Sequence, residues 1–331
     1  MATLKDIAQR AGVTATTVSR VINNRGYISE GTRKKVYAAM EEMHYQPNEL
    51  ARAFSKQYTN TIGLIVPHIS HPFFIKVISN LESSAAEKGF KLLLCNSKEQ
   101  PEKEQDYLDM CISNRVAGIV LCSKYVQTRE FRKMNIPVVN LERGGDDDTI
   151  SVQCDNYQGG KLAAEHLIEC GCKNLLHFGG VAGKDMPADR RADGFSDVCK
   201  KAGIPYRILV SDRLQYGSMH YEDFIRRVLQ EFPDVDGIFA SSDLIASQVI
   251  QVGAQMGKRV PEDIQLIGFD DVMISTVTTP QITTIHQPVE EMTELCVEYI
   301  AKSLKNESVP QKIVLPVRLV QRGTTVLKTE I

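Results

Sequence analysis

The sequence predicts an all-α head followed by an α/β body of two doubly wound lobes. Residues 3–46 contain three short amphipathic helical patterns separated by turn residues. Beyond residue 61, short apolar runs alternate with amphipathic helical patterns, which is typical of parallel sheets covered on both faces. The chain of 331 residues is also too long for one small core, so we expect two or three folding units.

The first two helices of the head are expected to flank a glycine turn. Thr3 and Asp6 have the spacing of a capping box, and the helix that follows them breaks at Gly12. The second helix should begin near Thr14 and run to about Asn23, with apolar residues on one face. Two short helices joined in this way predict a helix-turn-helix, whose second helix enters the DNA major groove.

The third helix should open at Ser29 and end before Pro47, because proline cannot continue a helix. The head is also basic. Residues 1–60 carry nine Lys and Arg against five Asp and Glu, whereas residues 61–331 carry 30 against 36. The net charge of −2 therefore hides a basic head on an acidic body, which is the distribution that phosphate binding needs.

Candidate DNA contacts lie on the second helix. Thr16 and Arg20 are four residues apart and share one face, and Thr17 lies beside them. An exposed arginine can make two hydrogen bonds to guanine, and the threonines can reach a base edge or phosphates. A capped helical hairpin with a solvated arginine is the alternative interpretation of this pattern.

The body contains candidate strands and helices in alternation. Strands are expected at residues 62–66, 91–95, 118–122, 138–141, 175–178, 208–210, 237–240 and 266–269. Helices are expected at residues 73–88, 103–114, 158–170, 191–202, 221–232 and 244–256. These strands are too many for one sheet of ordinary size, so we expect two lobes with a ligand cleft at the carboxyl ends of the strands.

The cysteines and the amino terminus predict a cytoplasmic protein. The eight cysteines are scattered without a CxxC pair, and most lie in apolar runs, which is typical of buried thiols in a reducing compartment. No apolar stretch has the length of a signal peptide or of a membrane span. We therefore expect no membrane association.

No motif predicts catalysis, a cofactor or a metal site. His68 and His71 are three residues apart, but no carboxylate or cysteine lies close enough in sequence to complete a metal site. The glycine-rich run at 179–185 lacks the first glycine and the Ser or Thr of a phosphate-binding loop. We expect no enzyme activity.

The head resembles that of the LacI/GalR family of repressors. The shared motifs are TLKDIA at 3–8, TVSRVIN at 17–23, YQPN at 45–48 and AR at 51–52. In that family, the segment after the third helix becomes helical when two chains sit together on a palindromic operator. The resemblance implies DNA-binding roles for Asn48 and Arg52, and for Phe54, which stands where the family has a minor-groove leucine. An ordinary packing role is the alternative for Phe54.

The resemblance to the LacI/GalR family extends over essentially all of the remaining chain and implies a body like that of periplasmic sugar-binding proteins. The shared motifs include IGLIVP at 62–67, HPFF at 71–74, DN at 155–156, RADGF at 191–195, GFDD at 268–271 and TTIHQP at 283–288. The resemblance implies a sugar-like effector clamped by Arg191 and Asp270, with Arg143 as a third contact. The residue types agree, because a guanidinium donates twice and a carboxylate accepts twice to neighbouring hydroxyls. Ser242 stands where many members have an asparagine.

Two aromatic residues are further candidates for effector contact. Phe73 and Phe74 follow the first strand at its carboxyl end, where an aromatic face can stack on a sugar ring. For Phe73, a role limited to packing against the next helix is equally open.

The expected domain boundaries follow from the same motifs. We expect a helix-turn-helix head over residues 1–46, a hinge helix and linker over 47–60, and an effector-binding and dimerisation body over 61–331. The first lobe is expected at about 61–160 and 289–317, and the second at about 161–288 and 318–331. No heptad tail follows Arg322, which favours a homodimer.

These features predict a sequence-specific DNA-binding transcriptional regulator, a repressor of carbohydrate-utilisation genes controlled by a small sugar or sugar-phosphate effector. Residues 25–30, 95–97, 101–104 and 315–317 resemble sucrose-operon repressors of Gram-positive bacteria. Whether the ligand weakens or strengthens DNA binding is open. A transport or chemotaxis sugar-binding protein shares the body, but it would need a signal peptide and would not carry residues 3–57.

Overall fold

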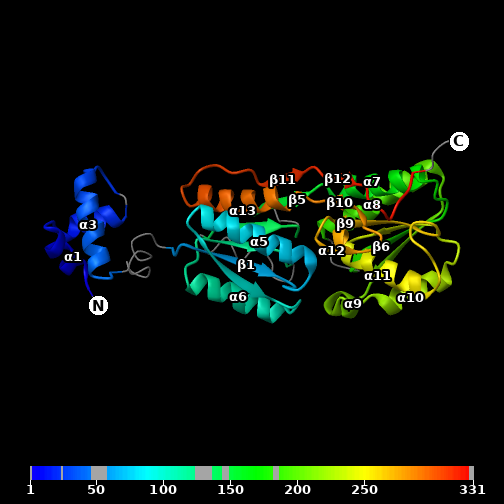
Figure 1. The fold of residues 1–331 in the computed structure, drawn as a ribbon, viewed down its shortest axis with the longest axis horizontal. Helices are drawn as coiled ribbons and strands as arrows, with labels where there is room; N and C mark the ends of the chain where they lie inside the picture. The colour runs from blue at the N-terminus through cyan, green and yellow to red at the C-terminus, as the bar shows by residue number, and fades with distance from the viewer. Residues whose placement is uncertain are drawn as a thin grey trace. The chain divides into compact units, whose positions relative to one another are not determined.

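The computed structural model describes residues 2–23, 25–45, 58–123, 136–143, 149–181 and 186–327. The chain divides into two compact units, Met1–Thr59 and Asn60–Ile331 (Figure 1). Within the described residues, no helix is both long enough and apolar enough to cross a membrane.

The first unit is built from the helices α1 (Leu4–Ala11), α2 (Ala15–Ile22) and α3 (Glu30–Glu42). The predicted capping box starts α1. The Thr3 side chain accepts from the Asp6 amide, and the Asp6 carboxylate accepts from the Thr3 amide at 2.8 Å. Gly12 then ends α1 in the left-handed conformation, with φ of 67°. The predicted helical head is therefore confirmed.

Apolar side chains from the three helices form a small core. Its fully buried members are Ile7, Val18, Val21 and Val36. At the surface, the guanidinium of Arg10 donates to both carboxylate oxygens of Glu42, at 2.9 and 2.7 Å, and joins α1 to α3. Helix α3 ends at Glu42, before the limit that Pro47 sets.

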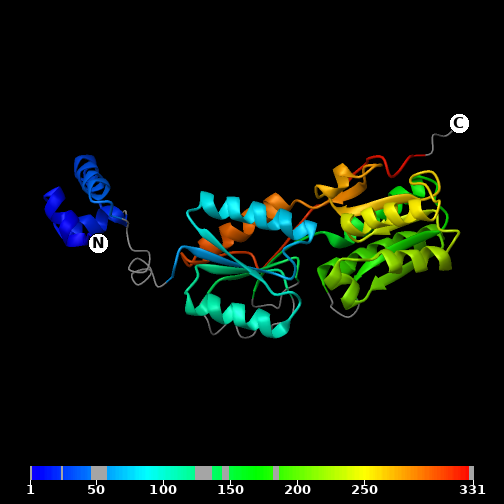
Figure 2. The same cartoon turned by 60° about the horizontal axis from the view of Figure 1, so that its bottom comes forward.

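The strands described in the second unit form two six-stranded sheets. The first sheet has the order β11-β5-β4-β3-β1-β2 and all its strands run parallel. Its strands are β1 (Thr61–Val66), β2 (Lys91–Asn96), β3 (Gly118–Leu121), β4 (Val138–Leu141), β5 (Ile150–Cys154) and β11 (Lys312–Leu315). Helices α5 (Pro72–Glu87) and α13 (Val289–Ser303) cover one face, and α6 (Pro101–Ser113) covers the other (Figures 1 and 2).

The second sheet has the order β12-β10-β9-β8-β6-β7, with β12 antiparallel to β10 and the other neighbours parallel. Its strands are β6 (Leu175–Val181), β7 (Tyr206–Ser211), β8 (Gly237–Ala240), β9 (Gln265–Asp270), β10 (Thr283–His286) and β12 (Arg318–Val320). Its main covering helices are α7 (Asn156–Glu169), α8 (Arg190–Ala202), α10 (Glu222–Glu231) and α11 (Asp243–Gln255). Helices α7 and α8 lie on one face, and α10 and α11 lie on the other.

In the described part of the body, the chain passes three times between the two sheets. It leaves the first sheet after β5, returns after β10, and leaves again between β11 and β12. Each lobe is therefore assembled from segments that are distant in sequence. The predicted architecture of two doubly wound lobes is confirmed.

Several elements were missed by the sequence prediction. They are β5, β10, β11, β12, the long helix α13 and the short helices α9 (Arg213–Ser218) and α12 (Ile274–Val277). Helix α13 has no side-chain hydrogen bond at its N-cap, so the start signal for a helix is absent there. The strand β12 is only three residues long, which is too short to show alternation.

Helices α7 and α8 cross at two glycines. A Cβ atom at Gly160 would lie 2.0 Å from the backbone oxygen of Arg191. A Cβ atom at Gly194 would lie 2.0 Å from the backbone oxygen of Tyr157. Because no side chain fits at either position, this close crossing fixes where the start of α8 lies.

Candidate functional site

A cavity of about 140 Å³ lies at the carboxyl ends of strands from both sheets. Its lining includes residues that follow or end these strands: Pro67, Cys122, Glu142, Gly179, Gly180, Ser241 and Asp270. In a doubly wound sheet the loops at this edge converge, so both lobes contribute side chains to one site. The position agrees with the predicted ligand cleft.

The structure brings most of the predicted effector residues together. Phe73, Phe74, Arg191, Ser242 and Asp270 all line the cavity. Arg143 is absent from the described lining, but its Nε donates to the carbonyl of Ser123, which does line the cavity. Its Nη1 donates to Oδ1 of Asn140 at 3.1 Å. The roles of these residues in effector binding stay predictions.

Arg191 is buried and tightly held at the start of α8. Its guanidinium stacks 3.5 Å above the centre of the Phe269 ring. Its Nε donates to Oδ1 of Asn156 at 2.8 Å, and its Nη1 donates to the carbonyl of Ser241 at 2.6 Å. The side chain therefore enters the cavity in one orientation.

Asn156 connects Arg191 to the first lobe. Its Nδ2 donates to Oε2 of Glu142 at 3.0 Å and to the carbonyl of Cys154 at 3.2 Å. Glu142 also accepts from the Cys154 amide through Oε1 at 2.5 Å. Sequence reasoning placed Asn156 in a family motif but did not select it as a site residue, because the preceding strand β5 was missed.

Asp270 ends β9 in an unusual backbone conformation, with φ of 110°. Its Oδ1 accepts from Nε2 of Gln287 at 2.6 Å. Burial raises the pKa of the Asp270 carboxyl to about 7, although Arg191 and Gln287 act in the opposite direction. Gln287 also lines the cavity, and sequence reasoning did not select it.

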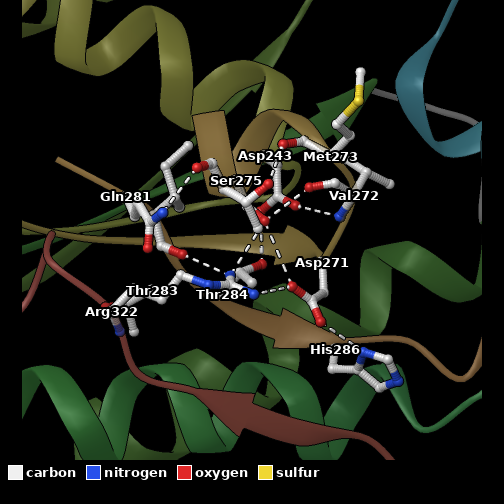
Figure 3. A network of polar contacts seen from close by, with 12 residues as sticks. Asp243, Asp271, Val272, Met273, Ser275, Gln281, Thr283, Thr284, His286 and Arg322 are labelled. Carbon is white, nitrogen blue, oxygen red and sulfur yellow. Dashed lines mark hydrogen bonds and ion pairs between the residues drawn. The ribbon is translucent and has the colours of Figure 1, made fainter. Parts of the chain in front are cut away.

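The next residue, Asp271, fixes the turn that carries Asp270. Figure 3 shows its carboxylate between His286 and Arg322. Nδ1 of His286 lies 2.7 Å from one oxygen, and Nη2 of Arg322 donates to the other at 2.5 Å. Burial acts to raise the pKa of Asp271, but the bonds from Arg322 and His286 outweigh it and lower that pKa. From the first lobe, Nζ of Lys76 donates to the Asp271 carbonyl at 2.9 Å.

Aromatic rings from both lobes form one wall of the cavity. The His71 ring lies 5.7 Å from the Phe74 ring and 6.4 Å from the Tyr216 ring, centre to centre. Burial, with smaller contributions from His68 and Arg191, lowers the pKa of His71 to about 4. His71 is therefore neutral at pH 7. Neither His71 nor Tyr216 was selected from the sequence.

The predicted DNA contacts lie on α2 of the head. Thr16 and Arg20 are exposed, whereas Val18 and Val21 face the core. The Thr17 amide donates to Oγ1 of Thr14 at 3.1 Å. Thr14 is therefore the N-cap of α2, and Thr17 takes part in the cap through its amide. The other predicted contacts, Asn48, Arg52 and Phe54, lie outside the described residues.

Comparison with known proteins identifies the family. The family described as bacterial regulatory proteins, lacI family, matches residues 3–48, and the periplasmic binding protein-like domain matches residues 164–325. The ribose operon repressor of Halalkalibacterium halodurans is 33% identical over 98% of this chain and 97% of its own. The sucrose operon repressor of Pediococcus pentosaceus is 36% identical over 97% of this chain and 98% of its own.

The chain belongs to the LacI family. Solved structures of LacI-family regulators share its fold. The lac repressor dimer bound to operator and an anti-inducer has a TM-score of 0.82 and 25% identity, and covers 98% of this chain and 99% of its own. A LacI-type regulator from Alkaliphilus metalliredigens, complexed with D-xylulofuranose, has a TM-score of 0.73 and 32% identity, and covers 81% of this chain and 100% of its own. These LacI-family relatives are regulators, not enzymes.

Proposed function

We propose that this LacI-family protein is a cytoplasmic, sequence-specific repressor of carbohydrate-utilisation genes whose operator affinity is controlled by a small sugar-like effector. One observation carries the proposal. A chain with an exposed Arg20 on a helix-turn-helix also holds a cavity that is lined by a buried arginine, Arg191, and a buried carboxylate, Asp270.

The head would bind DNA as part of a homodimer on a palindromic operator. Thr16 and Arg20 are available for base contacts, and Thr17 is positioned near the amino end of α2, where phosphates bind. We assign the hinge to residues 47–60, with Asn48, Arg52 and Phe54 as its DNA contacts. The lac repressor dimer bound to its operator supports this arrangement by its similarity.

The effector would bind between the lobes. Phe73 and Phe74 offer apolar contact, Arg191 and Asp270 offer donors and acceptors to hydroxyls, and Arg143 supports the wall through Ser123. Ser242 uses its hydroxyl oxygen to accept from the Ile245 amide at 3.2 Å, which leaves its proton for an effector oxygen.

Effector binding and DNA binding are coupled by the arrangement of the lobes. An effector shifts operator affinity only through its different affinities for the two arrangements, and about 1–3 kcal/mol of coupling is typical. The residues allow either sign of this coupling.

The test is a DNA-binding titration of the full chain against inverted-repeat duplexes at several salt concentrations. Each titration is repeated with ribose, fructose and sucrose. We expect salt-dependent preference for one repeat and a change in affinity with at least one sugar. Binding that lacks any sequence preference, with and without the sugars, would overturn the proposed function.

A further inference from the structure

The turn at the end of β9 holds two residues in a backbone conformation that side chains disfavour. Asp270 has φ of 110° and Asp271 has φ of 53°, and neither is a glycine. Such conformations persist only where the surrounding structure enforces them, and they gather at functional sites. Because this turn carries Asp270 into the lining of the effector cavity, the contacts that hold residues 270–272 also decide where the Asp270 carboxyl group lies.

Asp243 holds this turn from the first turn of α11. Its Oδ2 accepts from the amide of Val272 at 2.9 Å, and its Oδ1 accepts from the hydroxyl of Thr284 at 2.6 Å (Figure 3). Asp243 thereby joins three elements, which are the start of α11, the turn and the strand β10. It is not among the described residues that line the cavity, so its connection to an effector is indirect.

The carboxyl group of Asp243 is costly where it lies. Its side chain is 0% exposed, and both of its hydrogen bonds come from uncharged donors. Burial raises the pKa of Asp243 well above its ordinary value, and the nearby Asp270 carboxylate raises it further. A carboxyl group kept in such a place lowers stability, and residues with this property are concentrated at functional sites.

Strand β9 leaves room for this carboxyl group. A Cβ atom at Gly268 would lie 2.3 Å from Oδ1 of Asp243, which is closer than real Cβ contacts come. Gly268 lies two residues before Asp270 on the same strand. The missing side chain lets the carboxyl group of Asp243 lie against β9 and reach the amide of Val272.

From these observations we infer that Asp243 is a positioning residue, which fixes the turn at 270–272 and thereby keeps the Asp270 carboxyl group in the lining of the effector cavity. The inference rests on the proposed function and adds to its effector site a residue that lies outside the cavity. The bond to the Val272 amide holds the turn, and the bond from Thr284 orients the carboxyl group that makes it.

The test is calorimetric titration of the full chain and its variants with ribose, fructose and sucrose. Asp243→Ala leaves the Val272 amide without this acceptor, so it should weaken the binding of any of these sugars that the unchanged protein binds by at least about tenfold. Asp243→Asn should keep the affinity within about threefold, because its amide oxygen can accept from Val272 and its amide nitrogen can donate to Thr284. Operator affinity without sugar should be unchanged in both variants.

A core variant of the same helix separates positioning from loss of stability. Val249→Ala removes packing at a fully buried position six residues further along α11. It should lower the urea concentration at which the protein unfolds, because it leaves a cavity, without changing sugar affinity.

A threonine pair tests the same bond without replacing Asp243. Thr284→Val removes the hydroxyl group that orients the Asp243 carboxyl group, so it should weaken sugar binding about threefold or more. The matched control is Thr293→Val, at an equally buried position on α13, where the hydroxyl group bonds to carbonyls of its own helix. Its sugar affinity should equal that of the unchanged protein.

The outcomes are distinct. Full sugar affinity in Asp243→Ala overturns the inference and leaves the proposed function standing. Equal losses of affinity in Asp243→Ala and Val249→Ala also overturn it, because general destabilisation is then the cause. The same holds if Asp243→Asn loses as much affinity as Asp243→Ala, since the asparagine variant keeps both hydrogen-bonding atoms.

Two further outcomes complete the test. If Asp243→Ala does not fold, Thr284→Val decides, and full sugar affinity in that variant overturns the inference. Absence of binding by all three sugars to the unchanged protein overturns the effector part of the proposed function together with the inference.

Discussion

Nε of Arg191 donates to Oδ1 of Asn156 across 2.8 Å, and this bond ties the start of α8 to the start of α7. The same asparagine donates to Glu142, which follows β4 of the first sheet. One amide side chain therefore links the two lobes beside the effector cavity. It therefore contributes to the orientation of both charged partners, beside the contacts of Arg191 with Ser241 and of Glu142 with Cys154.

Replacing this asparagine tests that contribution. Asn156→Ala removes hydrogen bonds to two buried charged groups, so it should lower the free energy of unfolding by about 1–3 kcal/mol. It should also weaken sugar binding at least tenfold, because Arg191 loses one of the contacts that orient it. Urea unfolding and calorimetry measure the two effects. The control is Asn80→Ala, which removes a single bond to the Lys76 carbonyl within α5. Unchanged sugar affinity in Asn156→Ala would contradict the positioning role.

Effector binding should depend on pH through Asp270. Its pKa of about 7 means that the carboxyl is mostly protonated at pH 6 and mostly ionised at pH 8. Hydroxyl donors prefer the ionised form, so affinity should rise about tenfold between these pH values. Asp270→Asn should abolish the pH dependence and most of the sugar response while sparing operator affinity. Calorimetry at several pH values tests this, and a variant that keeps the rise would exclude Asp270 as its source.

Stability at acidic pH should depend on His177. This side chain is 1% exposed, and burial lowers its pKa to about 4, while its Nδ1 bonds to the carbonyl of Phe239. Between pH 6.5 and 4 the unfolded chain binds a proton here that the native chain does not, so stability is lost as pH falls. The loss from pH 7 to pH 5 should be about 2 kcal/mol. His177→Gln should remove this component from the pH profile of urea unfolding, whereas His220→Gln, at an exposed position, should not.

The close crossing of α7 and α8 should not accept a side chain. Gly160→Ala places a Cβ atom 2.0 Å from the Arg191 backbone oxygen, so the helices must separate. We expect a loss of at least about 1–3 kcal/mol in unfolding free energy and weaker sugar binding. Gly217→Ala is the control, since its Cβ atom meets nothing within 4 Å. Thermal unfolding of the two variants should differ clearly; equal stabilities would show that the crossing tolerates a methyl group.

Base selectivity should depend on Arg20. Arg20→Ala removes an exposed guanidinium from α2 and should cost about 1–3 kcal/mol on the preferred operator, with relaxed selectivity. Lys35→Ala removes the same charge from an exposed position on α3 and should leave selectivity intact. Competition binding against operator variants measures both. Selectivity retained by Arg20→Ala would remove it from the base-reading set.

Sequence patterns predicted the parts of the fold that have strong local signals. The capping box at Thr3 and the apolar stripe through Val18 and Val21 are encoded within a few residues, and both appear as expected. The strand β5 does alternate apolar and polar residues, with Ser151 and Gln153 between apolar neighbours, but the prediction relied on continuous apolar runs and missed it. Its neighbours β4 and β11 stabilise it through tertiary pairing.

The site was predictable where a charged residue ends or follows a recognisable strand. Asp270 meets that description and lies in the cavity. Gln287 follows the short strand β10, which was missed, and its importance comes from burial and from its bond to Asp270. Tyr216 lies on a six-residue helix far along the chain, and only the tertiary fold brings it to His71.

The threefold passage of the chain between its two sheets restricts how the body can move. Because three backbone segments join the two lobes, any relative motion of the lobes must be accommodated by all three segments together. Cleavage of the backbone in any one of these three segments would leave the two lobes joined by the other two segments.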